Sequence, residues 1–114
     1  MKINQIVEAV KGKVACCQEN LDKEVRFGFA SDLMSDVLTL RDDDILLITG
    51  LSNIQAIRTA ELSDISVVLL VRNKTASKEM VDMAREAGIV LITTEYSMFR
   101  TSGILYEKGL PPIY

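Results

Sequence analysis

Three short runs of uninterrupted apolar residues dominate the pattern of hydrophobic and polar positions along the chain. They begin at Ile45, Val67 and Ile89, so each start lies about 22 residues after the one before. Short runs without polar alternation are typical of strands buried on both faces, and such strands belong to parallel sheets covered by helices. The pattern therefore predicts an α/β fold with a mostly parallel central sheet flanked by helices.

Further elements complete this sheet to about five strands. Strands are also expected at 13–17 and at 24–27, where polar and apolar residues alternate. Apolar residues recur at helical spacing in the segments 3–10, 33–40, 51–60, 80–87 and 96–106. Residues with good N-capping side chains precede four of these helices, namely Ser31, Ser52 or Asn53, Thr75 or Ser77, and Thr93 or Thr94. Gly88 is expected to end the fourth helix.

The even spacing of the three runs leaves a solenoid as an alternative fold, because leucine-rich arrays repeat every 20–29 residues. The three units share no side-chain signature beyond a strand followed by a helix, and residues 1–40 break the period. Right-handed crossovers between neighbouring parallel strands account better for the spacing.

Length and composition predict one domain, residues 1–114, with an ordinary apolar fraction of 48% and charged fraction of 25%. The net charge is −3 and the basic residues are scattered, so nucleic acid is not an expected partner. The apolar runs stop at about five or six residues, far short of the roughly 20 that span a membrane. Neither a membrane segment nor a signal peptide is expected, and the adjacent Cys16 and Cys17 suit a reducing, cytoplasmic compartment.

Familiar catalytic signatures are missing from the sequence. The chain has no histidine, which removes the commonest general base and metal ligand. It also lacks the glycine-rich phosphate loop, the dinucleotide-binding glycine motif, the serine elbow and the zinc-protease motif. We therefore expect a non-catalytic domain without a metal or cofactor.

Polar residues follow each of the three apolar runs, directly before a helix is expected to begin. The carboxyl ends of parallel strands meet at one edge of a sheet, and helix N-termini attract anions there. The sequence predicts a pocket for a small anionic or nucleotide-like ligand lined by Thr49, Gly50, Ser52, Asn53, Arg72, Asn73, Lys74, Thr93 and Thr94. The alternative is that these residues are only helix caps and turn formers.

A second polar group consists of Ser31, Asp32 and Asp36. These residues are expected on one helix, where the i, i+4 spacing of Asp32 and Asp36 places both carboxylates on the same face. Paired carboxylates can hold Mg²⁺ and support phosphotransfer, which is the least favoured of three functions. A solvated polar face is the simpler explanation.

The C-terminal segment carries candidate contacts for a partner. Tyr96 and Phe99 are expected in the core, whereas Tyr106, Ile113 and Tyr114 are candidates for an interface. An apolar tail on a small domain can make a self-complementary contact between two copies. A homodimer, or docking on a separate enzyme, is therefore the second hypothesis for function, and packing of the tail on its own domain is the alternative.

The segment from Gly28 to Leu38, the strand from Ile45 to Gly50 and the unit from Ile89 to Phe99 together resemble the DRTGG domain family. That family is similar to the N-terminal domain of bacterial HPr kinase/phosphorylase, and the resemblance extends from about Ile3 to Tyr106. It implies a regulatory or accessory domain that stands alone here, without the phosphate loop of the kinase portion. The literal Asp-Arg-Thr-Gly-Gly string is absent.

Overall fold

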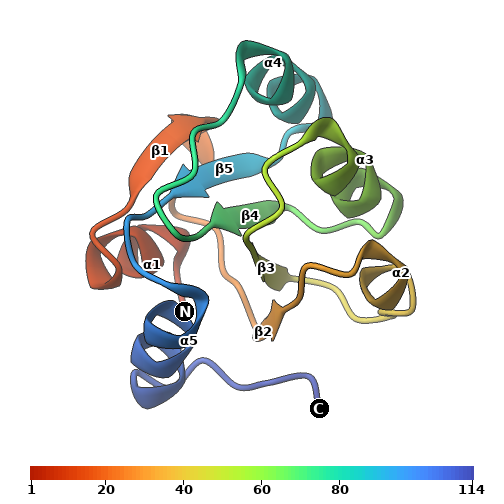
Figure 1. Ribbon diagram of the computed structural model, residues 1–114. Helices are drawn as coiled ribbons and strands as arrows, with labels where there is room; N and C mark the ends of the chain where they lie inside the picture. Colours follow the sequence, from red (N-terminus) through yellow and green to blue (C-terminus); the bar gives the residue numbers. More distant parts are fainter.

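The computed structural model describes residues 1–114 and shows one five-stranded sheet with helices on both faces (Figure 1). The elements in chain order are α1 (Ile3–Ala9), β1 (Lys13–Cys16), the 3-10 turn η1 (Gln18–Asn20), β2 (Phe27–Ala30), α2 (Met34–Val37), β3 (Ile45–Thr49), α3 (Ile54–Leu62), β4 (Val67–Leu70), α4 (Lys78–Ala87), β5 (Val90–Thr93) and α5 (Met98–Glu107). No helix is long and apolar enough to cross a membrane.

The strands lie in the order β1-β5-β4-β3-β2. Strands β2 to β5 are parallel, and only β1 runs antiparallel, against β5. At the centre of the sheet, Val68 pairs with Leu47 on one side and with Leu91 on the other. The predicted mostly parallel α/β sheet is confirmed, and the solenoid alternative is wrong because the three repeated units form neighbouring strands of one open sheet.

Helices cover the two faces unequally (Figure 1). On one face α2, α3 and α4 lie in a row, where α3 packs against both neighbours, while α1 and α5 lie together on the other face. Every residue of β3 and β4 is buried between these layers. Two-sided burial is the physical reason why these strands lack polar alternation.

Side chains at the helix starts satisfy backbone N–H groups that have no partner within the helix. The Asn53 side chain accepts from the Ala56 N–H, and Ser77 accepts from the Met80 N–H, both at 3.2 Å. These two caps, and the end of α4 at Gly88, whose φ is +73°, confirm the predictions made from the sequence. For α5 the prediction is wrong, because the cap is Ser97 and not Thr93 or Thr94.

The second strand lies three residues later than predicted. The expected alternation at 24–27 is not a strand, because the Val25 N–H donates to the Met1 carbonyl instead of to a sheet neighbour. Phe27–Ala30 pairs with Ile45–Ile48, so β2 includes Gly28, which lies outside the predicted strand. Leu110 packs beside Gly28, where an added Cβ would lie 3.1 Å from the Leu110 Cδ2.

The second helix is shorter than predicted and begins later. Ser31 is not its cap; its Oγ accepts from the Leu33 N–H at 3.0 Å and forms a turn before α2. Met34 and Val37 are buried, but Leu33 and Leu38 are exposed, so only half of the expected inward stripe faces the core. Helix α2 has only four residues, about one helical turn, which is too short to bury all four apolar side chains of this face.

The C-terminal segment packs on its own chain beyond Pro111. Pro112 forms a bridge with Gly28, Ile113 packs against the core, and the Tyr114 ring lies edge-on to Phe29 with the centroids 6.4 Å apart. Leu110 is buried, and the Gly28 N–H donates to the Pro111 carbonyl at 2.9 Å along the outer edge of β2. Phe99 is 90% exposed, so its expected place in the core is wrong. Helix α5 instead turns Thr101 and Leu105 inward.

Candidate ligand-binding site

The carboxyl ends of the parallel strands meet at one edge of the sheet. The register places Thr49 of β3 beside Leu70 of β4, and Leu70 beside Thr93 of β5. The antiparallel β1 begins at this same edge, where Lys13 lies opposite Thr93. The three polar strand ends therefore share one border, as the sequence predicted.

The chain leaves two neighbouring strands of this edge in opposite directions. After β4 it passes to α4 on one face, and after β5 it passes to α5 on the other face (Figure 1). In open α/β sheets a crevice forms where the loops that follow adjacent strands diverge in this way. The topology thus places a crevice between the ends of β4 and β5.

A cavity of about 370 Å³ lies at this position. It is lined by Lys11, Lys13, Ala15, Asn73, Lys74, Thr75, Ala76, Val81, Thr93, Thr94 and Glu95. We call this cavity the β4–β5 crevice. It brings together four residues that the sequence predicted for a ligand site, Asn73, Lys74, Thr93 and Thr94.

Positive charge is in excess in the β4–β5 crevice. Three lysines, Lys11, Lys13 and Lys74, line it together with a single acidic residue, Glu95. All three lysines are exposed and none forms an ion pair; the four ion pairs of the protein involve other basic groups. The cavity therefore holds uncompensated charge, which favours an anion.

Two consecutive left-handed residues shape the loop between β4 and α4. Arg72 has φ +65° and Asn73 has φ +56°, and their N–H groups donate to the carbonyls of Tyr96 at 2.8 Å and Thr94 at 2.9 Å. These bonds tie the loop after β4 to the loop after β5. The next N–H groups, those of Lys74, Thr75 and Ala76, have no acceptor in the protein.

Thr94 has a positioning role in the crevice. It is buried, and its Oγ1 donates to the Val10 carbonyl at 2.7 Å while accepting from the Tyr96 N–H at 3.2 Å. The hydroxyl therefore joins the end of β5 to the end of α1, close to the turn that carries Lys11. Thr93, by contrast, is only half-buried, and no protein group hydrogen-bonds its hydroxyl.

The end of β3 is occupied by a carboxylate of the chain itself. Asp32 Oδ1 accepts from the Thr49 Oγ1 at 3.0 Å and from the Gly50 N–H at 2.6 Å. Ser52 Oγ donates to the Thr75 carbonyl at 2.9 Å, and the Asn53 side chain caps α3. None of the predicted residues Thr49, Gly50, Ser52, Asn53 and Arg72 lines the β4–β5 crevice.

The predicted pairing of Asp32 with Asp36 on one helix is wrong. Helix α2 begins at Met34, so Asp36 belongs to it while Asp32 precedes it and turns toward β3. No group of three or more His, Cys, Asp or Glu side chains is arranged to hold a metal ion. The shared helix face on which the Mg²⁺ hypothesis was based is therefore not present.

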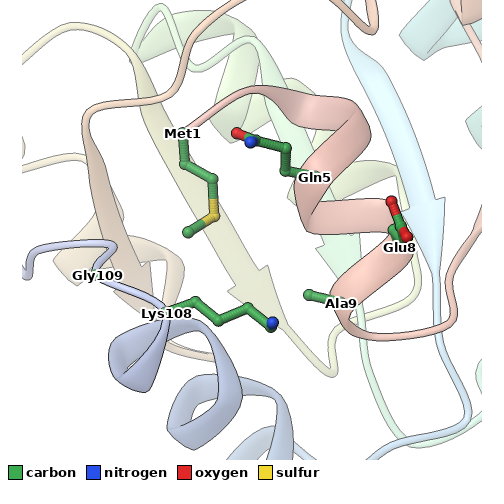
Figure 2. A pocket seen from close by; sticks show the side chains of 6 residues that line it. All are labelled: Met1, Gln5, Glu8, Ala9, Lys108 and Gly109. Carbon is green, nitrogen blue, oxygen red and sulfur yellow. The ribbon is translucent and has the colours of Figure 1, made fainter.

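The largest cavity of the protein lies elsewhere, with a volume of about 710 Å³ between α1 and the end of α5 (Figure 2). Met1, Gln5, Glu8, Ala9, Lys108 and Gly109 line it. Figure 2 shows Lys108 extending across the gap toward Ala9, with the Met1 side chain pointing into the gap. The lining side chains of this cavity include one acidic residue, Glu8, and one basic residue, Lys108, so their charges cancel. No strand end reaches the cavity, and the smaller β4–β5 crevice is therefore the better candidate for an anion site.

Sequence reasoning missed Lys11 and Lys13. They come from the turn before β1 and from β1 itself, and they reach the crevice only because β1 is antiparallel to β5. The two lysines are easily seen in the sequence as Lys11-Gly12-Lys13. The local sequence does not indicate, however, with which strand this segment pairs.

The fold places this chain among α/β domains that have a crevice at the carboxyl ends of their parallel strands. The chain belongs to the DRTGG domain family, whose sequence model matches residues 5–107. No curated protein matches the sequence.

Among solved structures, the chain is similar to the crystal structure of the CBS and DRTGG domains of the regulatory region of a Clostridium perfringens pyrophosphatase, complexed with its activator diadenosine tetraphosphate. The TM-score is 0.75 at 16% sequence identity. The aligned region covers 96% of this chain and 47% of that chain, so this chain spans about half the length of its structural neighbour. At this identity the similarity shows the fold alone.

Proposed function

We propose that residues 1–114 act as one regulatory, non-catalytic domain that binds a small anionic metabolite or nucleotide in the β4–β5 crevice. The observation that carries the proposal is a cavity of about 370 Å³ with three unpaired lysines, at the place where the loops after β4 and β5 diverge. Such crevices are the usual ligand sites of open α/β sheets. Binding there would join two loops and the edge strand β1.

The structural neighbour supports a regulatory role, because it belongs to the regulatory region of an enzyme and was crystallised with a nucleotide activator. Within the proposed site, Lys11, Lys13, Asn73, Lys74 and Thr93 supply groups that contact the ligand. Thr94 positions them through its bond to Val10. The other predicted residues, Thr49, Gly50, Ser52, Asn53 and Arg72, shape the neighbouring turns.

A thermal-shift screen of anionic metabolites and nucleotides tests this proposal. A ligand at 100 times its dissociation constant stabilises the folded state by about 2.7 kcal/mol. For a chain of this length that corresponds to a rise in Tm of about 10 °C. Lys74→Ala should reduce the shift, because it removes one of the three lysines of the crevice, and Lys108→Ala, which removes an equal charge at the α1–α5 cavity, should leave the shift unchanged. A screen in which no anion raises the Tm would refute the proposal.

A second function, as an interaction or dimerisation module, is favoured by one specific observation. Three aromatic residues near the C-terminus are largely exposed: Phe99 by 90%, Tyr106 by 69% and Tyr114 by 84%. Exposed aromatic side chains are enriched at protein interfaces. Light scattering coupled to size exclusion tests this alternative: a concentration-dependent dimer that Tyr106→Ser disrupts supports it, and a monomer at every concentration contradicts self-association.

A further inference from the structure

We infer that the β4–β5 crevice recognises the phosphate end of a small phosphorylated metabolite, with at least two negative charges, and makes no specific contact with a nucleobase. This inference rests on the proposed function and narrows the class of ligand. It follows from the charge, the donor groups and the shape of the crevice.

The charge balance selects for more than one negative charge. Three lysines against one glutamate give the lining a formal charge of +2, counted from Lys11, Lys13, Lys74 and Glu95. A monocarboxylate would leave part of this charge uncompensated, whereas a phosphomonoester dianion or a diphosphate matches it. Because the lysines are exposed, the attraction is screened by salt and must weaken as ionic strength rises.

The donors come from three segments that are distant in the sequence. Lys13 lies directly opposite Thr93 in the β1–β5 pair, so both side chains stand on the same face of the sheet. Lys11 comes from the preceding turn and Lys74 from the loop after β4. Lysine side chains that reach one cavity from different segments suit phosphate oxygens, which accept hydrogen bonds from several directions.

Main-chain donors add to the lysines. The N–H groups of Lys74, Thr75 and Ala76 have no acceptor in the protein, and all three residues line the crevice. The neighbouring N–H groups of Arg72 and Asn73 are already bonded to Tyr96 and Thr94, which holds the loop in place. Successive unbonded N–H groups on a fixed loop are a recurring feature of phosphate sites.

The lining offers no surface for a nucleobase. It contains no aromatic residue, and its apolar members are limited to Ala15, Ala76 and Val81. Tyr96 follows the lining residue Glu95 in the sequence, but its ring is covered by Arg100, whose Cζ lies 3.8 Å from the ring centroid. Base recognition commonly uses stacking on aromatic rings, so the base of a bound nucleotide would extend into solvent.

Isothermal titration calorimetry with inorganic pyrophosphate, ATP, adenosine and citrate tests the inference. We expect pyrophosphate and ATP to bind within threefold of each other, and adenosine not to bind. Lys13→Gln combined with Lys74→Gln should weaken pyrophosphate binding at least tenfold at unchanged Tm. The matched control, Lys2→Gln combined with Lys108→Gln, makes the same change in net charge away from the crevice and should leave the affinity within twofold.

The outcomes separate the inference from the proposed function. ATP binding tenfold more tightly than pyrophosphate, or measurable binding of adenosine, would overturn the phosphate-only inference and leave the ligand site intact. Citrate binding without pyrophosphate binding would have the same meaning. Failure of all anions to bind would overturn both, and equal losses in the two double variants would show that the site lies outside the crevice.

Discussion

Asp32 shows how one side chain decides which strand end can take a ligand. Its carboxylate accepts from the Thr49 hydroxyl and the Gly50 N–H, so it already occupies the anion position at the end of β3. Glu95 lines the crevice at the end of β5, but its carboxylate accepts no hydrogen bond from either strand end. An external anion is therefore expected at the β4–β5 crevice and not at Thr49.

Removing this carboxylate should destabilise the fold. In Asp32→Ala the buried Thr49 hydroxyl loses its acceptor, and the Gly50 N–H loses a short, charge-assisted hydrogen bond. We expect the free energy of unfolding in urea to fall by about 1–2 kcal/mol. Asp36→Ala, on the exposed side of α2, is the control and should change it by less than about 0.5 kcal/mol. Equal effects of the two variants would contradict the role given to Asp32.

Cys17 makes stability depend on pH in the alkaline range. Burial, together with the neighbouring Cys16 and Glu19, raises the pKa of the Cys17 thiol from 9.0 to about 11. Because the folded state binds this proton more tightly, its contribution is complete below pH 9 and is lost as pH rises toward 11. The free energy of unfolding should therefore decline over that interval. The decline should be smaller in Cys17→Ala, and an unchanged slope in that variant would show that the thiol does not cause it.

Among the helices and strands, those that local hydrophobic periodicity determines were predicted correctly from the sequence. Strands β3, β4 and β5 are continuous apolar runs because both of their faces are covered, and the caps Asn53 and Ser77 act within one helical turn. Strand β2 was misplaced because its pairing with β3 and its contact with Leu110 involve residues far along the chain. Elements that depend on distant partners carry no local signature.

The C-terminal tail is such an element, and its contribution can be measured. Leu110 is buried beside Gly28 of β2, so Leu110→Ala should lower the free energy of unfolding by about 2–4 kcal/mol. Tyr114→Ala is the comparison, since Tyr114 is 84% exposed and keeps only an edge-on contact with Phe29, so it should change stability by less than about 1 kcal/mol. If Leu110→Ala were as stable as the parent protein in chemical denaturation, the tail would not pack as described.

At the scale of the whole molecule, the strand-end site was only partly predictable. The parallel runs placed Asn73, Lys74, Thr93 and Thr94 at one edge, and the structure gathers these four around a cavity. Two further determinants come from topology: the divergence of the loops after β4 and β5, and the antiparallel β1 that brings in Lys11 and Lys13. Neither strand order nor strand direction at the edge can be read from local patterns, so two of the three lysines of the site could not be predicted from the sequence.

The location of anion binding is the central claim, and an NMR titration of ¹⁵N-labelled protein with inorganic pyrophosphate tests it most directly. We expect amide shift changes that saturate and that cluster in three segments, residues 11–15, 73–76 and 93–95, which meet only at the β4–β5 crevice. Shift changes confined to Met1, Glu8 and Lys108 would instead place the ligand in the larger cavity between α1 and α5 and would rule out binding at the crevice.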